Sequence, residues 1–205
     1  MSPRRAAALG TGDGTLRQHL IDTAARMIAE RASAALTVRA IAREAGVADG
    51  VLYNHFADKE ELLAHALRAR AESIGAGLGP LPEPGTATVE ENLRVYVGHG
   101  LTMHNALLPA LAALIAQPDV LARFAELSGG ADDWNRRLTA YLRAERDLGR
   151  LARDARVDAA TSLIVGACHE SVLSVLFQGR GIAREASVDV VDDLVAAVLN
   201  GLAPR

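Results

Sequence analysis

The segment 36–59 (LTVRAIAREAGVADGVLYNHFADK) constrains this chain more than any other, because a glycine in it separates two short apolar helical patterns. Thr37 precedes the first pattern as a helix-capping residue, and Gly46 follows it as a residue that readily adopts positive φ. Val47 then fills the junction, and a second short helix is expected over about 48–55. The segment therefore predicts a helix-turn-helix, whose second helix offers a side-chain-poor N-terminus to a DNA major groove.

The rest of the chain also favours helices. Half of its residues are hydrophobic and only 3% are aromatic, and strong helix formers outweigh β-branched runs. This composition and the apolar periodicity predict an all-α fold of about nine helices. The expected boundaries are caps at Thr15, Asp58, Thr88 and Ser187, first-turn prolines at Pro109 and Pro118, a proline-rich loop at 75–85, and breaks at 129–130 and Gly149.

The formal net charge of −3 does not suggest a nucleic-acid binder until the chain is divided. The first 20 residues carry Arg4, Arg5 and Arg17 against a single acidic residue. We expect residues 1–14 to form a flexible basic arm, in which Arg4 and Arg5 either contact DNA or only solubilise the chain. Such an arm on a nearly neutral domain can hold phosphates, because the local field matters more than the total charge.

Two runs of the sequence resemble the tetracycline-repressor (TetR) family of transcriptional regulators. The run IAREAGVADGVLYNHFADKEEL at 41–62 resembles the family signature, and LIDTAARMIAER at 20–31 resembles its first helix. The likeness spans residues 16–65 and is specific, because the motif is long and ordered. It implies a helix-turn-helix domain at 15–60 and a ligand-binding and dimerisation domain at 61–205.

The resemblance also implies a role for each matching position. Leu52 and Phe56 would stay in the small core. Asp49 departs from the family pattern, because it puts a carboxylate where polar or basic residues are commoner; a carboxylate there can accept from cytosine N4. The residues expected to face bases are Arg39, Asp49, Gly50, Val51 and Asn54, and those expected to hold the phosphate backbone are Thr37, Tyr53, His55 and Lys59.

The aromatic residues beyond position 90 have two interpretations. One is plain core packing, which is the usual role of aromatic stripes at helical spacing. The other, implied by the resemblance, is a largely apolar effector pocket with a few polar handles. The candidate pocket residues are Tyr96, His99, Met103, His104, Phe124, Trp134, Tyr141 and His169.

Metal and cofactor chemistry find little support in the sequence. His99 and His104 are five residues apart and therefore do not share one helix face cleanly, and no Cys or acidic cluster joins them. The single Cys168, in an apolar helical stretch, is expected to pack as a small hydrophobe. We expect no metal and no cofactor.

Dimerisation is predicted from the stretch 163–177 (LIVGACHESVLSVLF), which is apolar almost all round. Such a helix has too little polar surface to lie against one domain with its back in water. Together with the last helix it is expected to pair with a second copy in a four-helix interface. A two-fold dimer would place two recognition helices about 34 Å apart, to match a palindromic operator.

The most consistent interpretation is a homodimeric repressor that binds double-stranded operator DNA and is released by a small-molecule effector. With no signal peptide and no apolar stretch long enough to span a membrane, we expect a soluble cytoplasmic protein. One alternative is an activator or DNA binder of the same fold without a ligand. A helical enzyme is the remote alternative, because no catalytic motif such as GxSxG or HExxH is present.

Overall fold

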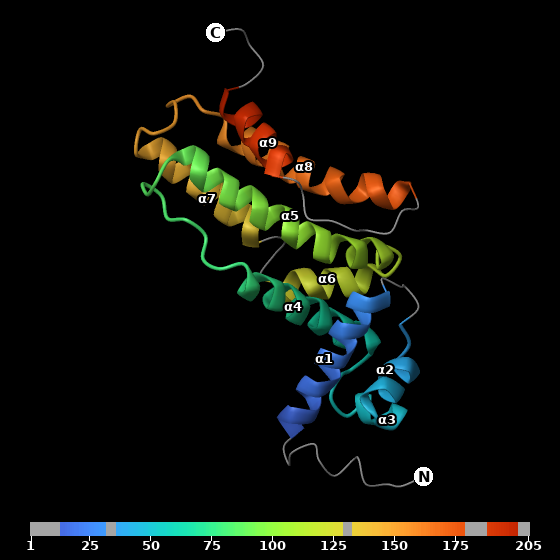
Figure 1. Cartoon of the computed structure of the whole chain (residues 1–205). Helices are drawn as coiled ribbons and strands as arrows, with labels where there is room; N and C mark the ends of the chain where they lie inside the picture. Colours follow the sequence, from blue (N-terminus) through green and yellow to red (C-terminus); the bar gives the residue numbers. More distant parts are fainter. Residues whose placement is uncertain (1–12, 32–35, 129–132, 179–187, 201–205) are drawn as a thin grey trace. The chain divides into compact units, whose positions relative to one another are not determined.

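The computed structural model describes residues 13–31, 36–128, 133–178 and 188–200. Within these ranges the chain forms nine α-helices and no β-strand, which confirms the all-α prediction (Figure 1). The expectations at Arg4, Arg5, 129–130 and Ser187 fall outside the described residues. The helices are α1 (Asp13–Arg31), α2 (Val38–Ala45), α3 (Asp49–Leu52), α4 (Lys59–Gly77), α5 (Val89–Ala113), α6 (Pro118–Leu127), α7 (Asp133–Asp147), α8 (Val157–Phe177) and α9 (Val188–Asn200).

Two predicted capping patterns form as hydrogen-bonded caps. The Asp58 carboxylate accepts from the Glu61 backbone N–H at 2.8 Å, before the first turn of α4. Thr88 Oγ1 accepts from the Glu91 N–H at 3.1 Å, and Glu91 Oε2 accepts from the Thr88 N–H at 3.0 Å. Each cap satisfies backbone donors that the first helical turn leaves without a partner, so the sequence locates the starts of α4 and α5.

The prediction for Pro109 is wrong, whereas the one for Pro118 is confirmed. Pro118 is the first residue of α6, but Pro109 lies inside α5 rather than in the first turn of a separate helix. A proline inside a helix removes one backbone hydrogen bond. Burial of Leu107 and Ala110 on either side of Pro109 favours the continuous helix in spite of that loss.

The chain folds into two compact units. Unit 1 lies within residues 1–74 and 109–131, and unit 2 within residues 75–108 and 132–205. The polypeptide passes between them inside α4 at Ile74–Gly75 and inside α5 at Leu108–Pro109. The functional division at residues 60 and 61 that the sequence suggests is a separate matter and stays a prediction.

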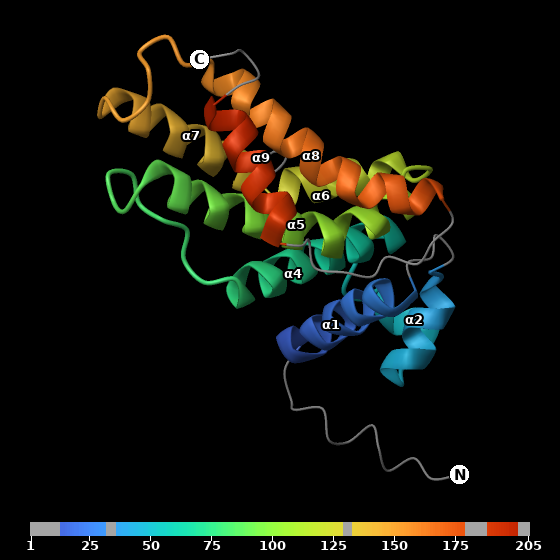
Figure 2. The ribbon, with the colours of Figure 1, turned by 45° about the horizontal axis from the view of Figure 1, so that its top comes forward.

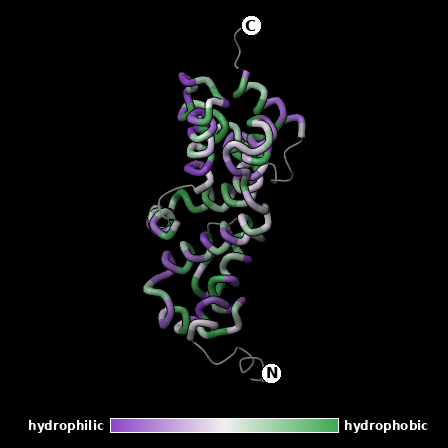
Figure 3. The backbone as a smooth tube through the Cα atoms, turned by 90° about the vertical axis from the view of Figure 1, so that its left-hand side faces the viewer, coloured by the Kyte–Doolittle hydropathy of each residue, from purple (hydrophilic) through white to green (hydrophobic). Residues whose placement is uncertain are grey.

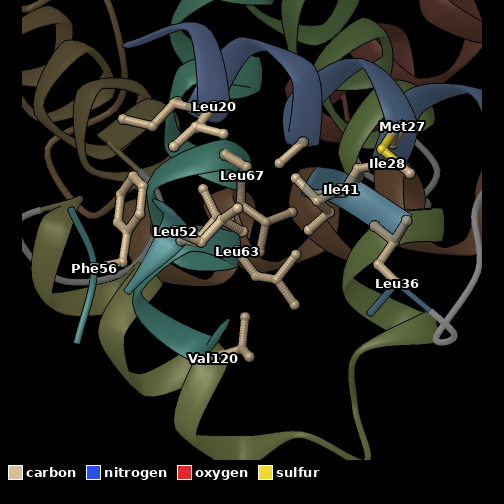
Figure 4. Packing of buried hydrophobic residues seen from close by; sticks show 14 of the residues in the cluster. Leu20, Met27, Ile28, Leu36, Ile41, Leu52, Phe56, Leu63, Leu67 and Val120 are labelled. Atoms are coloured by element: carbon tan, nitrogen blue, oxygen red, sulfur yellow. The ribbon is translucent and has the colours of Figure 1, made fainter. Parts of the chain in front are cut away.

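The core of unit 1 is almost entirely aliphatic. Side chains from α1, α2, α3 and α4 point toward one another, and Val120 of α6 joins them (Figure 4). Along the described helices, hydrophobic and hydrophilic residues are interspersed, as amphipathic helices require (Figure 3). The buried members of this cluster include Leu20, Met27, Ile41, Leu52, Phe56, Leu63, Leu67 and Val120.

The core of unit 2 joins α5, α7, α8 and α9. It contains three large aromatic side chains, Tyr96, Trp134 and Tyr141, together with leucine and valine residues and the buried Cys168. Helix α8 packs against both α7 and α9, which the second view shows from another side (Figure 2). This core therefore combines aliphatic packing with rings that have polar edges.

Candidate nucleic-acid interface

The turn between α2 and α3 has the geometry that the sequence predicts. Thr37 Oγ1 accepts from the Ala40 N–H at 3.1 Å and caps α2. Gly46 ends α2 with φ 74°, in the left-handed region that glycine enters without steric cost. The Val47 N–H donates to the Ala42 carbonyl at 3.0 Å, and the Val47 side chain packs on the core of unit 1. The two helices are therefore held at a fixed junction.

Helix α3 is shorter than predicted, but its hydrogen bonding continues through the next turn. The regular helix ends at Leu52 rather than near His55. Beyond it, the Asn54 N–H donates to the Val51 carbonyl at 3.2 Å, and the Phe56 N–H donates to the Leu52 carbonyl at 2.9 Å. Backbone hydrogen bonds therefore continue through the segment 49–56 beyond the end of the regular helix.

This segment separates buried residues from exposed ones by helical spacing. Leu52 and Phe56 are buried, as predicted, and anchor the segment in the core. Asp49, Gly50 and Asn54 are exposed, Tyr53 is 60% exposed, and Val51 and His55 are half-buried. The exposed Tyr53 side chain carries a hydroxyl that can hydrogen-bond a phosphate oxygen.

Gly50 lies at the start of α3, where the space beside its Cα atom is open. A Cβ atom built there would meet no other atom within 4 Å, and its φ is not in the left-handed region. Nothing within the protein therefore requires glycine at this position. A missing side chain is useful there if another molecule approaches the backbone closely.

Two of the predicted base-facing residues contact each other across the junction. Arg39 Nε of α2 lies 3.6 Å from Asp49 Oδ2 of α3, and their side chains are 89% and 54% exposed. Exposed pairs of this kind contribute little to stability. Their position on the surface formed by α2 and α3 is nevertheless where a DNA-reading group would have to stand.

Lys59, predicted to hold phosphate, is engaged within unit 1. Its Nζ donates to Gln117 Oε1 at 2.9 Å and lies 3.7 Å from Glu60 Oε1. The neighbouring Asp58 forms a two-pronged ion pair with Arg123 of α6, in which Nη2 donates to Oδ2 at 2.8 Å. The Arg123 guanidinium and the Glu61 backbone N–H hold the pKa of Asp58 below its usual value.

Arg17 of α1 lies on Phe56, beneath the exposed segment. Its guanidinium carbon is 4.7 Å from the Phe56 ring centroid, and its Nη2 is 2.9 Å from His65 Nε2. Burial, and then the Arg17 charge, lower the pKa of His65. A neutral His65 ring can accept from Arg17, so the cluster ties α1 to α4 at the base of the helix-turn-helix.

The predicted pocket residues do not all meet in one unit. Phe124 packs against the core of unit 1, whereas the other candidates belong to unit 2. In unit 2, Tyr96 stacks on Tyr141 at 4.6 Å between centroids, and Trp134 Nε1 donates to the Tyr96 carbonyl at 3.0 Å. Burial raises the pKa of both tyrosine hydroxyls.

His104 extends this aromatic group toward α8. Its ring is edge-on to Trp134 at 5.5 Å, its Nδ1 lies 2.6 Å from the Gly100 carbonyl, and its centroid is 4.7 Å from that of His169. His99 and Met103 are half-buried on the same helix, and burial lowers the pKa of His99. Among the described residues, no three His, Cys, Asp or Glu side chains gather as metal ligands.

Sequence reasoning missed a buried carboxyl in unit 2. The Glu145 side chain is completely buried; its Oε1 accepts from the Gly85 N–H at 3.1 Å, and its Oε2 lies 3.3 Å from Arg150 Nε. Arg150 also donates to the Thr86 carbonyl at 3.2 Å. No local pattern marks these contacts, because Glu145 reads as a solvated residue at the polar end of α7.

Helix α8 leaves two large apolar side chains exposed. One face buries Thr161, Ile164 and Cys168, whereas Leu163 is 64% exposed and Phe177 is 84% exposed. The expectation that no stretch is long and apolar enough to span a membrane is wrong for α8, which by length and composition is the one such helix among the described residues, although little of it is buried. A face of this kind needs a partner, and a second protein copy or a lipid phase would each supply one.

Comparison with known proteins links the helix-turn-helix region to one family. Residues 20–66 match the model for bacterial regulatory proteins of the tetR family. The HTH-type transcriptional repressor KstR2 of Mycobacterium tuberculosis is 52% identical over 52 residues, which are 25% of this chain and 26% of that protein. The chain thus covers about a quarter of the length of this curated relative, in the region where the notable motifs lie.

Two solved structures share the fold over most of the chain. The regulator FadR from Bacillus subtilis, in complex with stearoyl-CoA, aligns with a TM-score of 0.64 at 20% identity, over 91% of this chain and 99% of that one. A regulator from Saccharomonospora viridis, in complex with choline, aligns with a TM-score of 0.67 at 20% identity, over 94% and 100%. At these identities the likeness concerns the fold alone.

Proposed function

Because this chain belongs, through residues 20–66, to the tetR family of bacterial regulatory proteins, we propose that it is a DNA-binding transcriptional repressor. The observation that carries the proposal is the segment 49–56, which buries Leu52 and Phe56 and turns Asp49, Gly50, Tyr53 and Asn54 outward. That arrangement suits a helix whose N-terminus enters a major groove. No catalytic step is part of the proposal.

The repressor acts as a homodimer through α8 and α9. The exposed side chains Leu163 and Phe177 of α8 and Val190 of α9 supply apolar surface that a second copy would bury. The two recognition segments of a two-fold dimer then read the halves of a palindromic operator. The resulting protein works in the cytoplasm, where its operator is.

A small molecule bound in unit 2 releases the DNA. Helices α4 and α5 both run from one unit into the other, so a change in unit 2 has two continuous helices through which to act. The effector must bind the DNA-free state more tightly than the DNA-bound state, or it shifts nothing. FadR and the S. viridis regulator were solved with chemically unlike molecules, stearoyl-CoA and choline, which supports a variable effector site in this fold.

DNA binding by the full chain tests the proposal directly. An operator is selected from random duplexes, and affinity is measured by fluorescence anisotropy across a salt series. We expect log K to fall linearly with log salt, as phosphate contacts demand. We expect Tyr53→Ala to weaken binding about tenfold or more, through loss of a backbone hydrogen bond and packing.

The matched control is Ile115→Ala, which removes another exposed side chain of unit 1 outside α2 and α3. It should bind the operator as the unmodified chain does. Selection of no sequence at all, or equal losses in the two variants, would contradict the proposal.

The variant Leu163→Asp tests the dimer. Light scattering should show a monomer for it, whereas Val95→Asp on the exposed side of α5 should stay dimeric.

A regulator of the same fold without a small ligand is the second candidate. The observation that favours it is dense packing in unit 2, where Tyr96 stacks on Tyr141 and Trp134 presses on Gly100. Thermal-shift screening of a metabolite library separates the two candidates. A compound that raises Tm and weakens operator binding supports the ligand-released repressor, and operator binding that no compound alters supports the second candidate.

A further inference from the structure

The contact between Arg39 and Asp49 joins the two helices of the proposed DNA reader. Arg39 belongs to α2 and Asp49 begins α3, so the ion pair crosses the junction at Gly46. Both residues are exposed on the side from which a duplex would approach. The roles of Arg39 and Asp49 depend on the proposed function, and they determine which base the ion pair selects.

The atoms involved leave a particular set of donors available. The contact that links the two side chains runs from Asp49 Oδ2 to Arg39 Nε, at 3.6 Å. Nη1 and Nη2 of an arginine held in this way form the parallel pair of donors that fits O6 and N7 of guanine in the major groove. The Arg39 side chain stays 89% exposed in this contact, and the carboxylate favours those of its orientations in which Nε faces Asp49.

The same contact changes what Asp49 itself is suited to do. A carboxylate close to DNA is repelled by phosphates unless a positive group or a donor compensates for it. Arg39 supplies that charge from within the protein, and their attraction strengthens when DNA excludes water from the groove. A direct contact from Asp49 to cytosine N4 would require the carboxylate to turn away from the arginine.

We propose that Asp49 is a positioning residue, which orients Arg39 so that each half-site is read as guanine at one base pair. In this role Asp49 contributes to base preference without contacting a base. Without the Asp49 carboxylate, Arg39 can still reach DNA, but its side chain is no longer held in the orientation that fits guanine. The preference for guanine then weakens, while general affinity rises because a negative charge is lost near the phosphates.

The experiment measures base preference in the full chain at one salt concentration. Random duplexes are selected with the unmodified chain and with the variants Arg39→Ala, Asp49→Asn, Asp49→Ala and the double variant Arg39→Ala/Asp49→Ala. Affinities for the selected operator and its single-base changes follow. The charge-matched control is Asp22→Asn, which removes an exposed carboxylate on α1 that accepts from Gln18 of the same helix.

We expect Arg39→Ala to reduce discrimination at one base pair about tenfold to a hundredfold. Both Asp49 variants should reduce discrimination at that same base pair by about threefold to tenfold, as fits an ion pair that acts through its partner. The double variant should lose no more than Arg39→Ala alone. Asp22→Asn should leave every base preference unchanged.

Three results would overturn the inference. If the Asp49 variants lose preference at a different base pair, then Asp49 reads a base directly. If they change no base preference, the pair does not take part in reading. If the double variant loses the sum of both effects, the residues act independently. Failure of the unmodified chain to select any sequence would instead refute the proposed function, on which this inference rests.

Discussion

The two units bury different chemistry. Unit 1 packs aliphatic side chains around Met27 and Phe56, and among its described residues Thr23 is the one polar side chain recorded as buried. Unit 2 packs Tyr96, Trp134 and Tyr141. Its described part also buries four polar or charged residues, which are Asn92, His104, Glu145 and Thr161.

The difference matters because the two kinds of core respond differently to another molecule. The hydrophobic effect that stabilises an aliphatic core does not depend on direction, so it needs no polar partner. The close packing of that core holds a surface such as the segment 49–56 in one arrangement. Buried polar groups need partners with defined geometry, and a molecule that adds or removes one partner changes their free energy strongly. Unit 1 is therefore suited to present a fixed surface, and unit 2 is suited to respond.

The largest expected effect is on Glu145, the buried carboxyl of unit 2. Glu145→Ala should lower the free energy of unfolding by about 3 kcal/mol, because it leaves the Gly85 N–H without its acceptor, removes the ion pair with Arg150 and opens a cavity. Urea unfolding followed by fluorescence measures this, since Trp134 is the only tryptophan and reports on unit 2. Arg150→Ala should also destabilise the protein, because it leaves the buried Glu145 carboxylate without its counter-ion.

A loss below about 0.5 kcal/mol for Glu145→Ala would contradict this account of unit 2. It would mean that the carboxyl gains nothing from its burial, so that the polar character of this core has no energetic weight. The contrast with unit 1 would then reduce to the presence or absence of aromatic rings.

Gly100 in unit 2 gives the next largest effect. A Cβ atom there would lie 2.3 Å from Cζ2 of the buried Trp134 ring, so the ring must move. Gly100→Ala should destabilise the protein by about 2 kcal/mol. Gly98→Ala is the control on the same helix, because its Cβ meets nothing within 4 Å, and it should stabilise by about 0.5 kcal/mol. Equal stability of the two variants would show that the ring has room to shift.

Gly50 in unit 1 should show the opposite combination. Gly50→Ala meets nothing within the protein, so stability should stay unchanged or rise by about 0.5 kcal/mol. If DNA approaches this backbone closely, operator affinity should nevertheless fall about tenfold, as anisotropy would measure. Gly98→Ala again serves as the control and should leave operator affinity unchanged. Unaltered affinity in Gly50→Ala would argue that the start of α3 stands away from the groove.

Sequence reasoning succeeds where a structure is fixed by neighbours in the chain. Thr37, Gly46, Asp58 and Thr88 mark helix ends because their caps and turns use backbone groups within a few residues. The family resemblance implies that Leu52 and Phe56 lie in the core, and their burial confirms this. The DNA-facing residues also come from the resemblance, and their contact with DNA stays a prediction.

Contacts between distant positions had no such signal. Asp58 meets Arg123 across 65 positions, and Gly85 meets Glu145 across 60. Pro109 misled because burial on either side outweighs the local rule that proline begins a helix. The resemblance places Phe124 among the effector residues, whereas its side chain packs against the core of unit 1.

The smallest expected effect is on the pH dependence of stability, to which one histidine in each unit contributes. Burial lowers the pKa of His65 in unit 1 and of His99 in unit 2. A folded-state pKa below the unfolded value means that the unfolded chain binds more protons, so stability falls as pH drops through the ordinary histidine pKa of 6.5. We expect Tm to be lower at about pH 5.5 than at about pH 7.5.

His65→Gln should reduce the acid sensitivity of unit 1, as followed by operator binding, and leave the Trp134 signal of unit 2 unchanged. His99→Gln should do the reverse. If neither variant alters the acid response, the pH dependence arises from other groups, and Asp58 is not one of them, because its lowered pKa acts only below its ordinary value of 3.8.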